Sequence, residues 1–116
     1  MPNYNDERTH GAVQAPITQV VQLFTPAISH IRYSIEEDHY GDISLFLRIV
    51  LTDEAAKLGT YIVCKKITLA VQNRLRLIEL DLFPYFNWRS ASEQAKLQHP
   101  DWAQKPDNSP HALHQV

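Results

Sequence analysis

Residues 31–51, IRYSIEEDHYGDISLFLRIVL, decide the fold of this sequence. Apolar and polar residues alternate on both sides of the polar segment 37–42, and a period of two is typical of strands with one buried face. Gly41 is the residue of that segment that best tolerates a positive φ. The pattern predicts an antiparallel hairpin. One face of its second strand carries the expected core residues Ile43, Leu45, Leu47, Ile49 and Leu51.

Helical periodicity replaces this alternation on both sides of the hairpin. Upstream, Pro16 suits the first turn of a helix. Four apolar residues then share one helical face: Ile17, Val20, Val21 and Phe24. Downstream, we expect a long helix over about 54–80, which Gly59 either kinks or divides. Its apolar stripe consists of Cys64, Ile67, Val71, Leu75 and Ile78.

The segment that follows the long helix predicts the last strand. Residues 82–89, LFPYFNWR, are rich in aromatic side chains, and Pro84 suits a sheet edge because proline cannot donate a ladder hydrogen bond. Ser90 and Glu93 fit a capping box at the start of a short helix. The expected fold is therefore α+β. A small antiparallel sheet, formed by the β-hairpin plus a third strand, packs against the long helix, with an N-terminal helix and a short C-terminal helix.

Length and composition indicate one domain. We expect residues 1–15 to form a flexible N-terminal arm, 16–102 a single α+β domain and 103–116 a disordered tail. A net charge of −2 argues against general affinity for nucleic acid or anionic membranes. Cys64 is the only cysteine, so no intramolecular disulfide can form. Without a signal peptide or a membrane span, the sequence favours a cytoplasmic protein with no membrane partner.

The densest polar cluster lies at the hairpin turn, and it is our candidate surface for a protein partner. Its members are Glu36, Glu37, Asp38, His39 and Asp42. A solvated acidic turn is the structural alternative. Such a cluster could also hold a divalent cation and support a metal-dependent hydrolase. Adjacent strand residues point to opposite faces, however, and this works against convergence on one ion.

A second candidate surface is basic and supports the nucleic-acid alternative. Cations on the long helix could contact phosphates, and aromatic residues on the third strand could stack on bases. The residues concerned are Lys57, Lys65, Lys66, Arg74, Arg76, Tyr85 and Arg89. An exposed helix face and aromatic core residues are the structural alternatives. The acidic hairpin of one copy could also meet the basic helix of another, which would form a homodimer.

The order helix–strand–strand–helix–strand over residues 16–90 resembles that of KH-type RNA-binding domains and of ribosome-binding factor A. The resemblance implies RNA binding, although the sequence lacks the GXXG loop of KH domains. Ser-centred elbows, Gly-rich phosphate loops and zinc-ligand pairs are missing as well, so we assign no catalytic residue, metal ligand or cofactor. The leading hypothesis is a small non-enzymatic regulatory protein. It would bind a protein partner, as an antitoxin does, or a second copy of itself.

Overall fold

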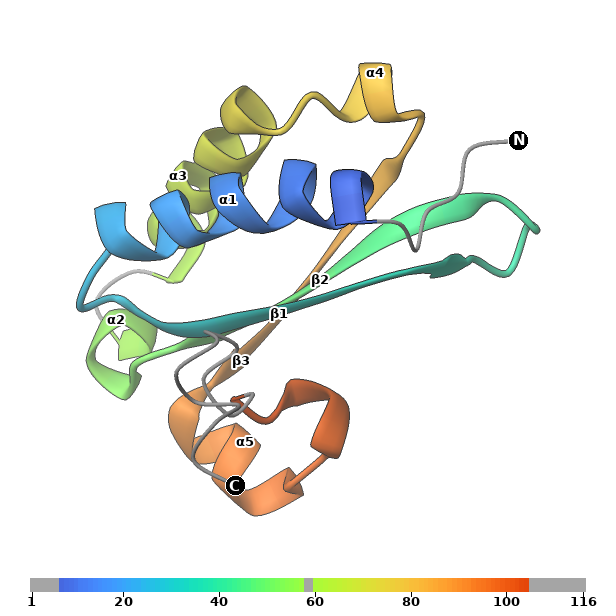
Figure 1. Cartoon of the computed structure of the whole chain (residues 1–116). Helices are drawn as coiled ribbons and strands as arrows, with labels where there is room; N and C mark the ends of the chain where they lie inside the picture. The colour runs from blue at the N-terminus through green and yellow to red at the C-terminus, as the bar shows by residue number, and fades with distance from the viewer. Residues whose placement is uncertain (1–6, 58–59, 105–116) are drawn as a thin grey trace, which may run out of the picture.

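The computed structural model describes residues 7–57 and 60–104. Helices α1 and α3 lie over one face of a three-stranded sheet, and α5 lies against the other face (Figure 1). This arrangement confirms the α+β class. The elements are α1 (Glu7–Leu23), β1 (Ile28–Glu37), β2 (Ile43–Leu51), α2 (Asp53–Lys57), α3 (Thr60–Arg74), α4 (Leu77–Leu80), β3 (Phe83–Ser90), α5 (Ala91–Leu97) and the 3-10 helix η1 (Pro100–Trp102).

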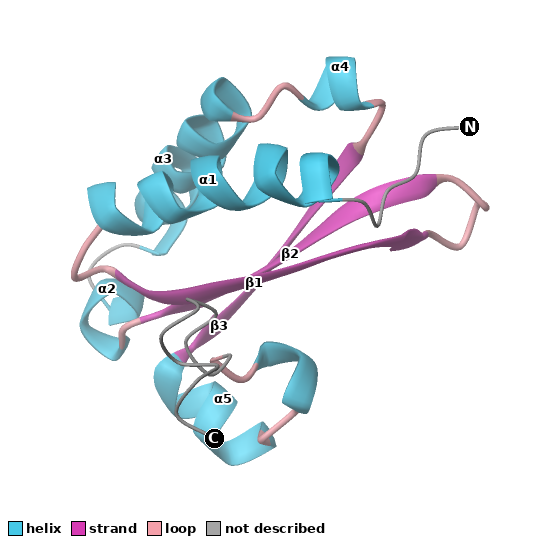
Figure 2. Ribbon diagram, in the orientation of Figure 1, coloured by secondary structure: helices cyan, strands magenta, loops and turns pink. Residues whose placement is uncertain are grey.

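Strands β1 and β2 form the predicted antiparallel hairpin. Ile31 lies opposite Ile49 and Tyr33 opposite Leu47, so the apolar residues of both strands share the face under the helices. Gly41 has φ +86°, the positive value expected of it at the turn. The far end of the hairpin extends past the N-terminal end of α1 and stands clear of the helices (Figure 2).

Strand β3 runs parallel to β2, so the prediction of an antiparallel third strand is wrong. Ser44 lies opposite Phe83 and Leu51 opposite Ser90, which places the starts of both strands at the same end of the sheet. The connection through α2, α3 and α4 brings the chain back to that end. Parallel neighbours require a long crossover of this kind, usually with a helix in it. The helical connection was the sequence signal for the parallel direction.

The N-terminal helix begins earlier than predicted. Helix α1 begins at Glu7 and passes through Pro16, so residues 7–15 of the predicted flexible arm are helical. Val13 is fully buried and extends the stripe of Ile17 and Val20 by one turn, and this burial offsets the cost of an internal proline. The predicted long helix is divided between α2 and α3, one of the two predicted alternatives, and is interrupted again between α3 and α4, which was not predicted. Residues 1–6 and 105–116, the rest of the predicted arm and most of the predicted tail, lie outside the described residues.

The core lies between the sheet and the α1–α3 layer. Leu45, Leu47 and Ile49 are fully buried, as the hairpin pattern predicted. Ile67 and Val71 of α3 and Leu75, which directly follows α3, pack onto them, while Cys64 is partly buried at the margin and carries a free thiol. Burial raises the pKa of this thiol. None of the described helices is long and apolar enough to cross a membrane.

Candidate functional site

Asp38 organises the hairpin turn. Its Oδ1 accepts hydrogen bonds from the backbone amides of Tyr40 (2.9 Å) and Asp42 (3.0 Å). Its Oδ2 accepts from the hydroxyls of Ser44 (3.1 Å) and Tyr85 (2.8 Å). An aspartate that bonds the amides following it stabilises a turn without help from a partner. Both carboxylate oxygens therefore serve the fold.

These contacts also set the charge state of Asp38. Partial desolvation acts to raise the pKa of Asp38, but donors from Asp42, Tyr85, Tyr40 and Ser44 together hold it below its ordinary value. The same contact, in which the hydroxyl donates to the carboxylate, is the main cause that raises the pKa of Tyr85. At neutral pH Asp38 is thus an ionised carboxylate that accepts a hydrogen bond from the neutral hydroxyl of Tyr85.

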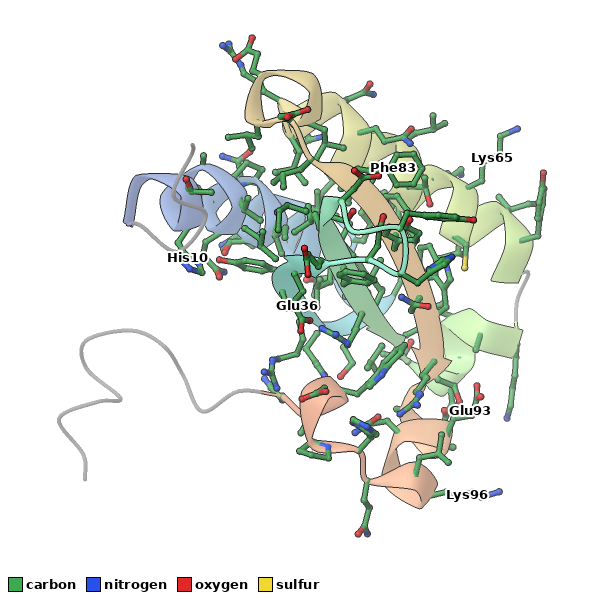
Figure 3. The ribbon with its side chains drawn as sticks, turned by 90° about the vertical axis from the view of Figure 1, so that its right-hand side faces the viewer. His10, Glu36, Lys65, Phe83, Glu93 and Lys96 are labelled. Carbon is green, nitrogen blue, oxygen red and sulfur yellow. The ribbon has the colours of Figure 1, made fainter. Side chains whose placement is uncertain are left out.

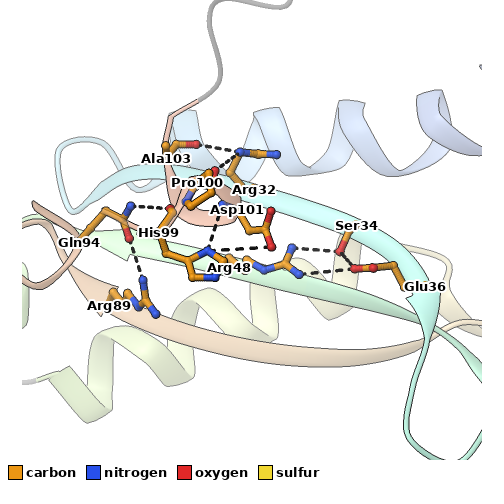
Figure 4. Close-up of polar contacts among 10 residues, drawn as sticks. All are labelled: Arg32, Ser34, Glu36, Arg48, Arg89, Gln94, His99, Pro100, Asp101 and Ala103. Carbon is orange, nitrogen blue, oxygen red and sulfur yellow. Dashed lines mark hydrogen bonds and ion pairs between the residues drawn. The ribbon is translucent and has the colours of Figure 1, made fainter. Parts of the chain in front are cut away.

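Glu36 belongs to the sheet rather than to the turn. Its carboxylate accepts a hydrogen bond from Ser34 (2.6 Å) and lies 3.5 Å from the Arg48 guanidinium, on the face of the sheet away from α1 and α3 (Figure 4). Because successive side chains of a strand point to opposite faces of the sheet, Glu36 and Glu37 point away from each other. The predicted five-residue cluster is therefore divided: Glu36 is exposed but paired with Arg48, Asp38 holds the turn, and Glu37, His39 and Asp42 are exposed at the turn.

The sequence analysis missed Tyr40, which lies at the centre of the turn. Its side chain is 76% exposed, and its ring lies 4.0 Å from that of His39, centroid to centroid. An aromatic residue within a polar turn was the available signal. We call Glu37, His39, Tyr40 and Asp42 the tip surface. Neither the Glu37 nor the Asp42 carboxylate forms an ion pair with a described residue.

Among the described residues, the acidic side chains do not gather into a metal site. Within residues 7–57 and 60–104, no three His, Cys, Asp or Glu side chains lie where they could hold a metal ion together. The two Asp38 oxygens already accept four hydrogen bonds, and Glu36 faces Arg48. The structure therefore does not bring together the four residues of the hydrolase alternative: Glu36, Asp38, His39 and Asp42.

The two halves of the predicted nucleic-acid surface lie on different layers. Lys57 ends α2, while Lys65, Lys66 and Arg74 belong to α3 in the helix layer. Arg76 follows α3 and pairs with Glu79 at 3.3 Å.

Tyr85 and Arg89 alternate with the core residues Phe86 and Trp88, so they point to the opposite face of β3. Arg89 donates to Gln94 Oε1 at 2.9 Å, and its guanidinium lies 4.1 Å from the centroid of the Trp102 ring. Tyr85 stacks on Phe46 and donates to Asp38. The structure thus does not join these two residues with the helix cations in one surface.

The C-terminal segment covers one end of this outer sheet face. The Trp102 carbonyl lies 2.7 Å from His30 Nε2. Arg32 donates to the carbonyls of Pro100 (2.9 Å) and Ala103 (3.1 Å) (Figure 4). His30 and Arg32 also line a pocket of about 240 Å³ between α1 and β1. Gln14, Gln22 and Gln104 line the same pocket, and Arg32 Nε is buried without a hydrogen-bond partner among the described residues.

Comparisons with protein-family models, curated proteins and solved structures found no match for this chain.

Proposed function

We propose that this chain binds a protein partner through the tip surface of its β1–β2 hairpin. One observation carries the proposal: Asp38 fixes the turn with four hydrogen bonds while Tyr40 projects from it, 76% exposed. A turn that is already ordered loses little conformational entropy on binding. Tyrosine is also among the residues that contribute most to binding energy at protein interfaces.

The tip surface indicates the chemistry of the partner. Glu37 and Asp42 flank Tyr40 and have no cation beside them among the described residues. A complementary surface has an apolar recess for the tyrosine ring with lysine or arginine at its margin, and such charges speed association. This fits a regulatory protein that occupies the basic site of its target, as an antitoxin does. The free Cys64 thiol fits a reducing, cytoplasmic setting.

A capture assay with matched variants tests the proposal. The tagged chain is incubated with nuclease-treated lysate that also contains the untagged chain, and bound proteins are quantified by mass spectrometry. We expect Y40A and the double variant E37K/D42K to lose at least ~90% of a bound protein, a tenfold effect that matches the loss of one central contact. Asp38 is left unchanged, because its substitution would disturb the turn itself.

Two control variants separate binding from general surface effects. L97A removes an exposed apolar side chain from α5, and E54K reverses an exposed charge on α2. Both should retain the bound protein, and all variants should keep the wild-type melting temperature within about 2 °C. Equal capture by wild type and tip variants would contradict the proposal. In a parallel sample without nuclease, co-elution of nucleic acid, with any bound protein lost after nuclease treatment, would instead favour the nucleic-acid alternative.

A further inference from the structure

Helix α3 is apolar on its outer side as well as on its inner side. Ile67 and Val71 face the core and are fully buried. On the outer side Tyr61 is 78% exposed, Ile62 60% and Leu69 49%. A surface helix normally needs only one apolar stripe, so a second exposed stripe marks an interaction surface.

Two lysines accompany these apolar residues. Helical periodicity places Lys65 one turn from Tyr61 and Lys66 one turn from Ile62, so all four share the outer side of α3 with Leu69. Figure 3 shows Lys65 projecting outward from α3, away from the sheet. Helix α3 contains no acidic residue, and neither lysine forms an ion pair with a described residue. We call Tyr61, Ile62, Lys65, Lys66 and Leu69 the helix surface.

We infer that the helix surface is the docking site for the tip surface of a second copy of this chain. The two surfaces are complementary: the tip surface offers one exposed aromatic ring and two carboxylates, and the helix surface offers apolar side chains and two ammonium groups. Charges of this kind select the partner and set its orientation. The inference rests on the proposed function and names its partner.

A second copy is needed because one copy cannot join its own surfaces. The tip stands beyond the helices at the far end of the hairpin, whereas the helix surface faces outward from the helix layer (Figures 1 and 3). When each of two copies offers both surfaces, a two-fold pair satisfies them twice. In a head-to-tail arrangement, the tip surface of each copy binds the helix surface of the next copy. In either case, each contact joins one tip surface to one helix surface.

Charge exchange tests the inference with the full-length chain. Sedimentation velocity is measured for wild type, for E37K/D42K, for K65E/K66E and for an equimolar mixture of the two variants. Wild type should self-associate, with a dissociation constant that rises at least ~10-fold between about 0.05 and 0.5 M salt. Each variant alone places like charges in contact and should bind itself at least ~10-fold more weakly. The mixture should recover to within about 3-fold of wild type, because every tip–helix contact then joins opposite charges.

Each outcome decides the inference. K96E, an exposed charge reversal on α5, is the control and should leave self-association unchanged. A wild type that stays monomeric up to about 100 μM overturns the inference, as does a mixture that fails to recover. If wild type captures a protein other than a second copy, and Y40A and E37K/D42K lose it, the proposed function stands but the partner is that other protein. If K65E/K66E instead abolishes binding of single-stranded RNA by a monomeric wild type, the helix surface belongs to nucleic acid and the inference fails.

Discussion

The hydroxyl of Tyr85 donates a hydrogen bond of 2.8 Å to Oδ2 of Asp38, across 47 residues of sequence. It joins β3, one outer strand of the sheet, to the turn at the far end of the hairpin. Because Asp38 also accepts the amides of Tyr40 and Asp42, the third strand supports the turn that presents Tyr40. Presentation of Tyr40 to a partner depends on this support.

Stability should fall on acidification partly through Asp38. The folded state lowers the pKa of this carboxyl, so its stabilisation is complete above the pKa of the unfolded chain and is lost as pH falls through the folded value. Asp53 contributes in the same direction, since the Ser92 side chain and amide lower its pKa. Urea unfolding between neutral pH and pH ~3 should therefore show a smaller acid-dependent loss for D38N than for wild type. Parallel curves for the two proteins would contradict the assignment.

Removing the Tyr85 hydroxyl should raise the pKa of Asp38. Y85F deletes one donor to the carboxylate and keeps the ring that stacks on Phe46. Carboxyl carbon shifts followed by NMR against pH would measure the change. Y61F is the matched control, because Tyr61 is 78% exposed and lies on α3, away from the turn. An Asp38 titration that Y85F leaves unchanged would show that the hydrogen bond does not form in solution.

The two described glycines should respond oppositely to alanine. A Cβ would meet nothing within 4 Å at either Gly11 or Gly41, so steric clash plays no part. At Gly41 the φ of +86° disfavours an L side chain, and G41A should lower the unfolding free energy by about 1–2 kcal/mol. Gly11 lies within α1, where G11A should stabilise by about 0.5–1 kcal/mol. Denaturant midpoints measure both effects, and a neutral G41A would refute the turn conformation.

Substitutions on the two sides of α3 should separate folding from association. Ile67 is fully buried, and I67A should cost about 2–5 kcal/mol of unfolding free energy. Leu69 is 49% exposed, and L69A should change the stability of the monomer by no more than about 0.5 kcal/mol. Dilute samples unfolded in urea would show the difference. A large loss in L69A at concentrations where the chain is monomeric would place Leu69 in the core.

Local patterns predicted the local structure well. Alternation identified the hairpin and its buried face, and Gly41 has the positive φ expected of the turn. Ser90 and Glu93 form the capping box at the start of α5, with both of its hydrogen bonds present. Each of these features depends on residues close together in sequence, where spacing alone determines which side chains can meet.

Features that depend on distant residues were not predicted. The direction of β3 follows from the path of the α2–α4 connection, and although a helical connection favours parallel strands, periodicity alone does not give the direction in which the chain returns. Alternation could place Tyr85 on the outer face, but not opposite Phe46 or within reach of Asp38. The acidic cluster of the candidate site therefore looked uniform in the sequence, whereas in the fold Asp38 bonds the turn, Glu36 pairs with Arg48 and Tyr40 is the prominent exposed group.

The most direct test of the account is photo-crosslinking from position 40. A photoreactive phenylalanine analogue replaces Tyr40 in one sample and Leu97, an exposed residue of α5, in the control sample. After irradiation in lysate that contains the native chain, adducts are mapped by mass spectrometry. We predict a light-dependent adduct from position 40 only, attached to α3 peptides of a second copy, and its yield should fall when E37K and D42K are introduced into the photoreactive chain itself. An adduct pattern identical at positions 40 and 97, or no adduct at position 40, would contradict the claim that the hairpin tip binds a partner.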